Sequence, residues 1–341
     1  VMKKGRVAVW CLAVLAVLLV SSAGYAEERK FRIEVLQVTD IGPFQASLTG
    51  FVSELQKNGL VQGKNLEIRR TVIDFDVEKA GLWSKVGVLL RITGEAQKIA
   101  DRKPDLVLTI GTPATKYAKD RIIKAGIPLV FTGVAVPTAA GCRSLREAGP
   151  GFTGATLYMD MDNVVKIIRL AFPSIKTLGV VHSEDENAVA QVDLLKKSAA
   201  AAGMKVMSRL IDKNARITPV AEEMNKEGID AFVIPLDTYY GMRNYEATND
   251  IRNLNLKWKK PGICLVYWKS PGAVLYIGSD FKHVGALSGS QAAKILLEGA
   301  RPETLPVLHQ EELGIMVDTG EMKKLNVQLP LQILQVAKPL N

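Results

Sequence analysis

The sequence predicts an α/β protein in which parallel sheets are covered by helices on both faces. Short apolar segments that favour β-structure alternate with segments of helical periodicity, and a new strand begins about every 30 residues. Crossover connections of that length join parallel strands. The alternation occurs in two successive series, separated by a connection rich in Pro and Gly from residue 136 to residue 151. A chain of 341 residues is long enough for about two such units.

The first series begins with a strand that turns into a helix. Phe44, Phe51 and Leu55 follow helical spacing, and an Asn-Gly pair ends that run. The second half of residues 74–102 has a helical pattern, whereas residues 80–84 give no clear assignment. We expect strands at residues 33–39, 66–73, 105–110 and 127–132, each followed by a helical or connecting segment.

The second series repeats the same alternation. Pro173 breaks an amphipathic helix, and Gly203 ends the next one. A further helix leads to Pro261. We expect strands at residues 178–181, 205–211, 231–237, 262–268, 273–277 and 313–317, and helices at 161–172, 187–202, 218–227, 283–297 and 320–325.

The amino-terminal segment has the pattern of a secretory signal peptide. Lys3, Lys4 and Arg6 precede an apolar run from residue 7 to residue 20, and small residues then lead to Ala26. We therefore expect cleavage after Ala26 and an exported, periplasmic protein. The alternative is a retained membrane anchor, for which the run is shorter than the roughly 20 residues that span a bilayer.

Charge and cysteine content narrow the class of protein further. Three of the 44 basic residues lie in the expected signal, so 41 remain against 35 acidic residues, a net charge of +6. This excess is spread along the chain, and we therefore expect no nucleic-acid partner. The cysteines that remain, Cys142 and Cys264, are far apart in the sequence, which leaves open whether they form a disulfide.

Residues 105–115 have the pattern of a buried strand that feeds a helix at a ligand site. Gly111 ends the strand, Thr112 is expected to be the helix N-cap, and Pro113 suits the first helical turn. Free backbone N–H groups at such a turn attract anions, and a glycine lets a ligand approach the backbone. The alternative is an ordinary strand-to-helix corner.

Polar and aromatic residues collect where the predicted strands end. Open α/β sheets bind ligands at the carboxyl ends of their strands, so these residues should converge on one crevice. Asp237 or Asp280 could pair with a ligand ammonium group or could cap a helix, and Tyr267 could stack on a ligand or pack within the lobe. The expected ligand-binding residues are Thr39, Phe44, Gly111, Thr112, Pro113, Thr132, His182, Ser183, Asp237, Thr238, Tyr267 and Asp280.

Motifs for catalysis and cofactor binding are missing from the sequence. It contains no G-x-x-x-x-G-K-[ST], and residues 285–289 lack the spacing of a hydrolase nucleophile elbow. A G-x-G-x-x-G spacing occurs at residues 149–154, but it lies in the connection rich in Pro and Gly and does not lead from a predicted strand into a helix, as a dinucleotide-binding turn would. The three histidines, His182, His283 and His309, do not have metal-ligand spacing. We therefore expect a protein that is not an enzyme and that binds no cofactor or metal.

Six stretches, taken in order, resemble one known family. They are residues 104–114, 127–132, 151–154, 178–181, 230–237 and 291–299. Together they look like the type I periplasmic substrate-binding proteins of ABC transporters, in the branch with tryptophan- and tyrosine-binding members. This resemblance implies two Rossmann-like lobes joined by a three-crossing hinge. The expected first lobe comprises residues 27–135 and 279–308, and the second comprises residues 136–278 and 309–341.

The resemblance also implies what the protein does. It points to a monomer that captures a small molecule and delivers it to a membrane permease. The expected ligand is an amino acid of the aromatic type. The turn at Gly111 and Thr112 would anchor the ligand carboxylate, and Asp237 with Thr238 would form the ligand-facing turn of the second lobe. Residues 74–92 exceed the usual connection in the family, and Tyr267 with Trp268 replaces a small polar stretch. A binding module for a membrane sensor and an exported enzyme on the same fold remain alternatives.

Overall fold

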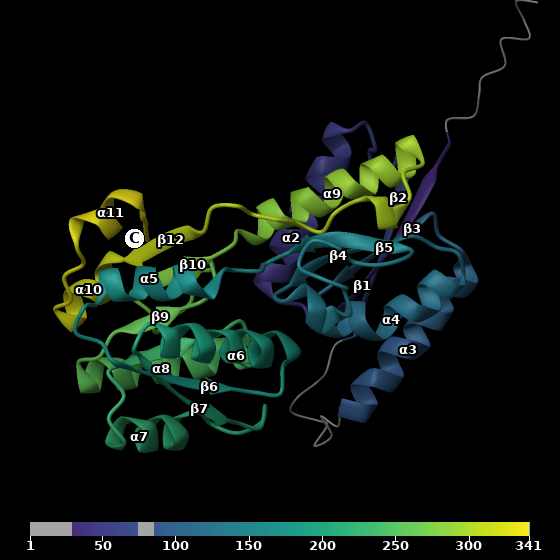
Figure 1. The fold of residues 1–341 in the computed structure, drawn as a ribbon. Helices are drawn as coiled ribbons and strands as arrows, with labels where there is room; N and C mark the ends of the chain where they lie inside the picture. Colours follow the sequence, from purple (N-terminus) through teal and green to yellow (C-terminus); the bar gives the residue numbers. More distant parts are fainter. Residues whose placement is uncertain (1–28, 74–84, 341) are drawn as a thin grey trace, which may run out of the picture.

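The computed structural model describes residues 29–73 and 85–340, which form two lobes, each built on one sheet (Figure 1). The α/β architecture expected from the sequence is confirmed. The expected signal peptide and the unassigned residues 80–84 lie outside the described residues. Within the described part, no helix combines the length and the hydrophobicity that a membrane crossing would require.

The first lobe contains a six-stranded parallel sheet with the order β11-β5-β4-β3-β1-β2. Every residue of its central strands β3 and β4 is buried, as expected for a parallel sheet covered on both faces. The strands are β1 (Phe31–Val38), β2 (Leu66–Ile73), β3 (Leu106–Ile110), β4 (Leu129–Val134), β5 (Phe152–Thr156) and β11 (Leu308–His309).

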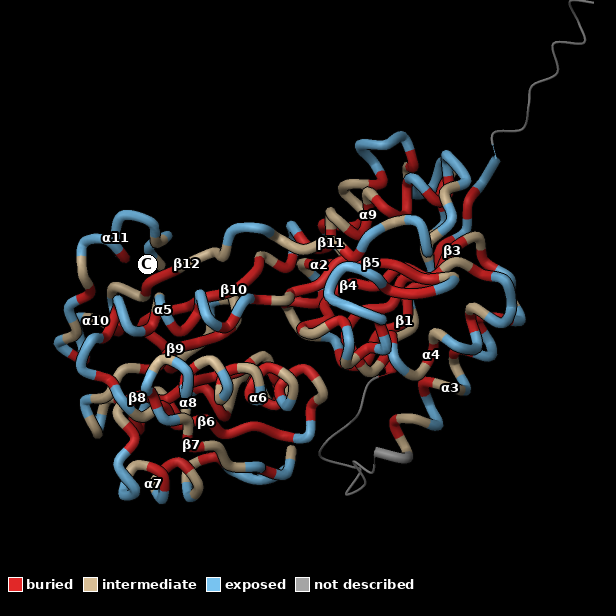
Figure 2. The backbone as a smooth tube through the Cα atoms, viewed as in Figure 1, coloured by how far each residue is buried: buried red, intermediate tan, exposed pale blue. Residues whose placement is uncertain are grey.

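Helices cover both faces of this sheet (Figures 1 and 2). On one face, α2 (Gly42–Lys57) and α9 (Phe281–Glu298) share a core with the strands, and on the other face α3 (Lys85–Arg102) and α4 (Thr112–Lys124) do so. The helices α2 and α9 pack unusually closely, because a Cβ at Gly285 would overlap the backbone oxygen of Ser47, and one at Gly50 would overlap that of Lys282.

The second lobe contains a seven-stranded sheet with the order β13-β12-β10-β9-β8-β6-β7, in which β12 is antiparallel to β10. The remaining pairs are parallel. The strands are β6 (Thr177–His182), β7 (Lys205–Leu210), β8 (Ala231–Ile234), β9 (Gly262–Cys264), β10 (Leu275–Gly278), β12 (Gly314–Asp318) and β13 (Lys338–Leu340).

Two groups of helices enclose the second sheet. One hydrophobic core joins it to α5, α6, α10 and α11, and a second core joins it to α7 and α8. Buried residues therefore run through the middle of both lobes in Figure 2. The helices are α5 (Met161–Ala171), α6 (Glu186–Ala201), α7 (Thr218–Lys226), α8 (Glu246–Trp258), α10 (Thr319–Leu325) and α11 (Leu331–Val336).

The described chain passes between the two sheets after β5, after β10 and after β11. The first crossing therefore follows Thr156 and does not lie at the expected boundary between residues 135 and 136. The reason is β5, which pairs in parallel with β4 from Phe152 onward and so belongs to the first sheet. Residues 152–156 are not among the strands expected from the sequence.

The cysteines Cys142 and Cys264 are both buried and free. They belong to the cores of different lobes, so no disulfide joins them. Burial raises the pKa of each thiol to about 12, which keeps both protonated at neutral pH.

Candidate ligand-binding site

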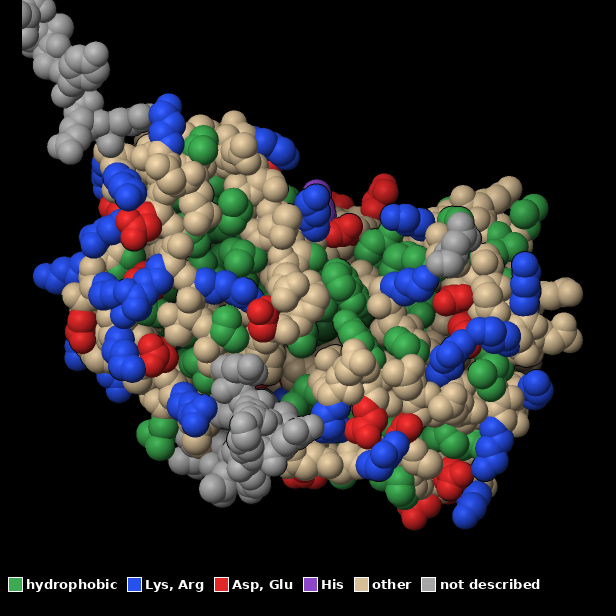
Figure 3. Space-filling model, turned by 180° about the vertical axis from the view of Figure 1, so that it is seen from behind, with side chains coloured by type: hydrophobic (Ala, Val, Ile, Leu, Met, Phe, Trp, Pro, Cys, Tyr) green, Lys and Arg blue, Asp and Glu red, His purple; other side chains and the backbone are tan. Residues whose placement is uncertain are grey.

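A cavity lies between the lobes, at the carboxyl ends of the second sheet's strands. Its walls are mostly apolar, as is typical of small-molecule sites. In Figure 3, hydrophobic side chains gather where the two lobes meet. The first lobe contributes Ile41, Pro43, Phe44 and Phe281, and the second contributes Asn187, Ile234, Pro235, Leu236, Asp237, Thr238, Tyr240, Gly241, Tyr245, Thr248, Cys264, Val266, Trp268 and Ser270.

Aromatic rings make up much of this lining. The Tyr240 hydroxyl donates to the backbone oxygen of Val181 at 2.8 Å, and Trp268 Nε1 donates to the Tyr245 hydroxyl at 3.2 Å. These hydrogen bonds fix the two rings from the second lobe, while Phe44 approaches from the first lobe. Such an arrangement can bind a flat apolar group between rings from both sides.

Among the described residues that line the cavity, Asp237 is the one whose side chain is acidic, and none is a lysine or an arginine. Its carboxylate accepts hydrogen bonds from the Ser183 backbone N–H at 2.6 Å, from the Ser183 hydroxyl at 2.8 Å, and from the Tyr239 backbone N–H at 2.9 Å. Burial raises the pKa of Asp237, and the nearby Asp185 carboxylate adds to the shift. Asp237 is thus the N-cap of the short helix Thr238–Gly241 and ties together the ends of β6 and β8.

Asp280 also acts as a helix cap. Its carboxylate accepts from the backbone N–H groups of Lys282 at 2.7 Å and His283 at 3.1 Å, at the start of α9. Its own backbone N–H donates to Gln310 at 2.9 Å. Asp280 lies at a crossing between the lobes and is not among the described residues that line the cavity.

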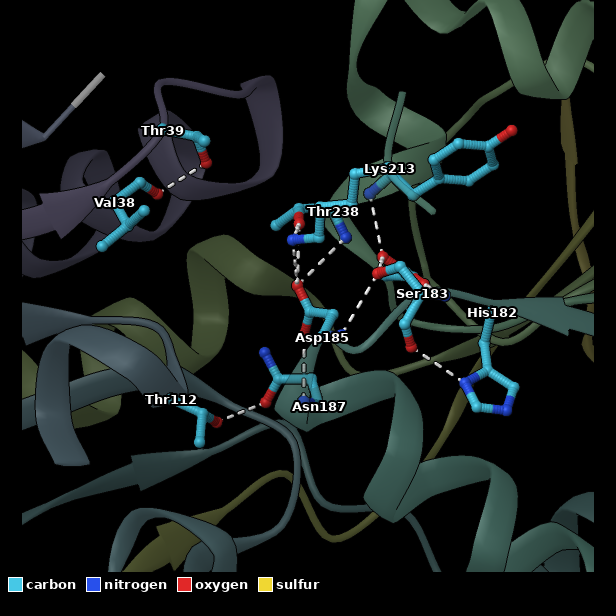
Figure 4. A network of polar contacts seen from close by, with 11 residues as sticks. Val38, Thr39, Thr112, His182, Ser183, Asp185, Asn187, Lys213 and Thr238 are labelled. Atoms are coloured by element: carbon cyan, nitrogen blue, oxygen red, sulfur yellow. Dashed lines mark hydrogen bonds and ion pairs between the residues drawn. The ribbon is translucent and has the colours of Figure 1, made fainter. Parts of the chain in front are cut away.

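The turn at Gly111 faces the second lobe. Gly111, with φ 92° and ψ 158°, is the N-cap of α4, so the expected cap, Thr112, is instead the first helical residue. The Thr112 hydroxyl donates to Asn187 Oδ1 (Figure 4). The same oxygen also accepts from the Ala135 backbone N–H at 2.9 Å. One side chain of α6 therefore holds two loops of the first lobe.

A second interlobe contact lies beside the first. Glu186 Oε1 accepts from Lys116 Nζ at 2.7 Å and from the Tyr117 hydroxyl at 2.8 Å. This hydrogen bond raises the pKa of Lys116, so the lysine is charged at neutral pH. The lobes are therefore in direct polar contact through the amino-terminal turns of α4 and α6.

A buried polar network underlies the cavity on the side of the second lobe (Figure 4). Asp185 caps α6 through the Asn187 backbone N–H at 3.0 Å and accepts from the Thr238 hydroxyl at 2.7 Å. Lys213 Nζ lies 2.9 Å from the same hydroxyl oxygen and 3.7 Å from the Asp185 carboxylate. Asp185 and Asp237, which follow the ends of β6 and β8, therefore both bind backbone or side-chain groups of neighbouring loops.

Other expected site residues lie around the cavity without lining it. The Thr39 hydroxyl donates to its neighbour Val38, and His182 Nδ1 lies 2.9 Å from the Ser183 backbone oxygen. Thr132 is fully buried, and its hydroxyl has no hydrogen-bond partner among the described residues. Pro113 lines a neighbouring hollow between α4 and α6.

The aromatic pair after β9 is divided between two tasks. Tyr267, the expected ligand residue, packs its ring on Gly314 of β12, where a Cβ would come 2.5 Å from Cε2. Trp268 lines the cavity instead. Three of the twelve expected residues, Phe44, Asp237 and Thr238, line the cavity. Tyr240, Tyr245 and Asn187 also line it, although the sequence did not point to them.

No cluster of three His, Cys, Asp or Glu residues that could hold a metal ion occurs in the described part of the chain. The polar groups of the site are carboxylates, hydroxyls and one amide, most of which bond to each other. What the arrangement can do is hold a mostly apolar molecule and exclude water around it.

Comparisons with known proteins agree with this geometry. The family model described as ABC transporter substrate binding protein matches residues 32–340. A tyrosine-binding protein from Clostridioides difficile (strain R20291) is 24% identical over 304 residues, which cover 88% of this chain and 82% of the relative.

Solved structures share the fold over nearly the whole chain. A conserved domain protein from Vibrio cholerae has a TM-score of 0.77 at 23% identity, with 92% of this chain and 100% of that chain covered. The ABC domain in complex with L-Trp from Streptococcus pneumonia has a TM-score of 0.75 at 19% identity, with the same coverage. Since the family model spans both lobes, this chain belongs to the ABC transporter substrate-binding protein family.

Proposed function

We propose that this protein captures an aromatic amino acid or a similar flat apolar molecule in the cavity between its lobes. The observation that carries the proposal is the cavity lining, in which Phe44 faces the second lobe's Tyr240, Tyr245 and Trp268. Relatives support it, because one is a tyrosine-binding protein and one solved structure holds L-Trp. We infer further that the protein is exported and hands its ligand to a permease in the membrane.

The lining also suggests how an amino acid is oriented. An apolar side chain among the rings loses contact with water, which favours binding by about 25 cal/mol for each Å² of apolar surface buried. Asp237 supplies negative charge near a ligand ammonium group, whereas the turn at Gly111 does not line the cavity. Closure of the lobes then surrounds the ligand.

Thermal-shift and calorimetric titration of residues 27–341 tests this proposal. The panel contains L-tyrosine, L-tryptophan, L-phenylalanine, 4-hydroxybenzoate and L-leucine. A ligand present at about 100 times its Kd should stabilise the folded protein by about 2.7 kcal/mol. We expect an aromatic member to shift the midpoint most. A shift with L-leucine that exceeds every aromatic one would overturn the assignment of ligand class.

A matched pair of variants tests the site itself. Phe44→Leu removes a ring from the cavity wall, whereas Phe31→Leu removes one from the same lobe's core away from the cavity; the two side chains are 5% and 7% exposed. We expect Phe44→Leu to raise the Kd about tenfold and Phe31→Leu to leave it unchanged, with similar losses of stability. Equal Kd values for both variants would place the ligand elsewhere.

Export and delivery need separate measurements. Expression of the whole chain in a Gram-negative bacterium should give periplasmic protein whose mass begins at Glu27. Reconstitution with a candidate permease and its ATPase should give uptake that depends on this protein. Binding without uptake, together with activation of a membrane kinase, would instead support a sensory role.

A further inference from the structure

Trp268 and Gly42 touch across the cleft between the lobes. Trp268 follows β9 in the second lobe, and Gly42 is the first residue of α2 in the first lobe. A Cβ at position 42 would lie 2.5 Å from Trp268 Cζ2 and 3.2 Å from both Cε2 and Cη2. Real Cβ atoms do not approach other atoms so closely, so the indole ring occupies space that only a glycine leaves empty.

This glycine is needed for space and not for backbone shape. Gly42 is absent from the residues of positive φ, so any amino acid could adopt its conformation. Its neighbours Ile41, Pro43 and Phe44 all line the cavity, as does Trp268. The contact therefore lies at the edge of the ligand cavity and joins its two walls.

A hydrogen bond within the second lobe fixes the indole ring of Trp268. Its Nε1 donates to the Tyr245 hydroxyl at 3.2 Å. Tyr245 ends a run of non-glycine residues with positive φ, Arg243 at 47°, Asn244 at 53° and Tyr245 at 61°. Such conformations are unfavourable outside glycine and persist where the surroundings impose them, often at ligand sites. Moving the ring away from Gly42 would give up the Tyr245 hydrogen bond and open the cavity wall.

We propose that the contact between Trp268 and Gly42 is the closure contact of the ligand site, with Trp268 as the affinity-determining residue of its outer wall. The proposal deepens the proposed function and rests on it. The two residues belong to different lobes, so the contact exists only when the lobes are together, and its free energy favours the closed form alone. A larger residue at position 42 wedges the lobes apart.

A double-mutant cycle with L-tyrosine and L-tryptophan as probes tests this. In wild type, Gly42→Ala should raise the Kd about tenfold, because the new methyl group collides with the indole ring. Trp268→Phe shortens the side chain so that it ends before Cζ2, and in that background Gly42→Ala should change the Kd less than about twofold. Alanine favours helix over glycine, so the unliganded midpoint should not fall in Gly42→Ala.

A second measurement reports closure without any ligand. Lys116 and Glu186 pair across the cleft at 2.7 Å, so Lys116→Cys/Glu186→Cys places two thiols that a short bis-maleimide alkylates and joins only when the lobes are together. This double variant lacks the native ion pair, so cross-linking rates are compared only among proteins that carry it. The native thiols are buried, and their raised pKa keeps them unreactive. We expect Gly42→Ala to slow cross-linking severalfold and added Trp268→Phe to restore the rate.

The two experiments separate failure of this inference from failure of the proposed function. Slower cross-linking in Gly42→Ala, together with no binding of either probe to the wild-type protein, would retain the closure contact and overturn the ligand class. An equal effect of Gly42→Ala in both backgrounds, on the Kd or on the cross-linking rate, would overturn the closure contact. An unchanged cross-linking rate in Gly42→Ala would overturn it as well.

Discussion

The carboxylate of Asp237 accepts three hydrogen bonds, two from Ser183 and one from the backbone of Tyr239. Before any ligand arrives, this side chain therefore connects two strand ends and begins a helical turn. Its structural role and a charge beside the ligand are compatible, because a carboxylate can accept about four hydrogen bonds.

Asp237→Ala should therefore destabilise the unliganded protein. The substitution leaves two buried backbone N–H groups without partners, and we expect a loss of about 2–3 kcal/mol in the free energy of unfolding. Asp280→Ala removes a less buried cap and should cost about 1 kcal/mol. Urea unfolding monitored by circular dichroism measures both. An unchanged stability in Asp237→Ala would assign the residue to the ligand alone.

Single residues also mark where the sequence stops being informative. The sequence indicated that the aromatic pair after β9 mattered, but it could not tell that Tyr267 packs on Gly314 while Trp268 turns to the cavity. β9 ends at Cys264, so the alternation of a regular strand no longer decides the direction of either ring. Thr112 is a residue type that often caps helices, so it was expected to be the cap of α4. The cap is Gly111, because the helical conformation already begins at Thr112.

At the scale of elements, the helices α2 and α9 meet through glycines. A Cβ at Gly285 would overlap the Ser47 backbone oxygen, and one at Gly289 would come 2.7 Å from the Phe51 backbone oxygen. Residues 285–289, which lack the spacing of a catalytic elbow, thus form a groove in one helix for the backbone of another. This packing positions the start of α2, where Gly42 and Phe44 meet the cavity.

Gly285→Ala should therefore lower stability although alanine favours helices. Forcing α2 and α9 apart should cost about 1–3 kcal/mol in the free energy of unfolding. Gly94→Ala in α3 is the control, since a Cβ there meets no atom within 4 Å, and it should stabilise by about 0.5–1 kcal/mol. Opposite signs in thermal unfolding are the expected result; stabilisation by both changes would contradict the close packing.

The helices α8 and α10 are joined by an acidic side chain that gives stability a pH dependence. Burial pushes the pKa of Glu321 upward, but hydrogen bonds from Arg252 at 2.7 Å and Lys324 at 2.9 Å outweigh it, so the pKa is lowered overall. A carboxyl whose pKa is lower in the folded state stabilises the protein above its unfolded pKa of about 4.3. That contribution is lost as the pH falls through the folded pKa.

Glu321→Gln tests this dependence. At about pH 7 the variant should unfold at a lower temperature than wild type, and the gap should shrink as the pH is lowered to about 3. Calorimetric midpoints across this range measure the gap. A gap that is constant with pH would show that the ion pairs of Glu321 contribute nothing beyond the contacts of an amide.

At the scale of the whole molecule, a small set of polar groups within residues 29–73 and 85–340 holds the lobes together. Asn187 Oδ1 accepts from Thr112 and from Ala135, and Glu186 accepts from Lys116 and Tyr117. These bonds form between lobes that each have their own cores. Their loss should therefore affect closure far more than folding.

Asn187→Ala should weaken ligand binding about fivefold to tenfold, because the closed form loses two buried hydrogen bonds. The unliganded midpoint should change little. Asn163→Ala, near the start of α5 on the exposed surface, is the matched control and should leave the Kd unchanged. Titration of L-tyrosine and L-tryptophan measures both variants. A large fall in the unliganded midpoint of Asn187→Ala with unchanged Kd would contradict a role in closure.

Sequence reasoning recovered the alternation of the two lobes because long parallel strands are apolar throughout and helices between them keep a regular period. It missed β5 because Thr153, Gly154 and Thr156 are short polar or small residues that follow a turn-rich connection. A cavity lies at the strand ends, where parallel strands all reach one edge, although only three of the twelve expected residues line it. Which side chains line it depends on the way the lobes meet, and local sequence carries no signal for that.

The repeated passage of the chain between the sheets means that neither lobe is continuous in sequence. The first sheet takes strands from residues 31 to 156 and again β11 at Leu308, and α9, which covers one of its faces, spans Phe281–Glu298. During synthesis the first lobe thus stays incomplete until α9 and β11, which ends at His309, have been made. Domains generally fold as units as the chain emerges, so this order delays folding of the lobe that comes first in the sequence until most of the second lobe's strands have also been synthesised.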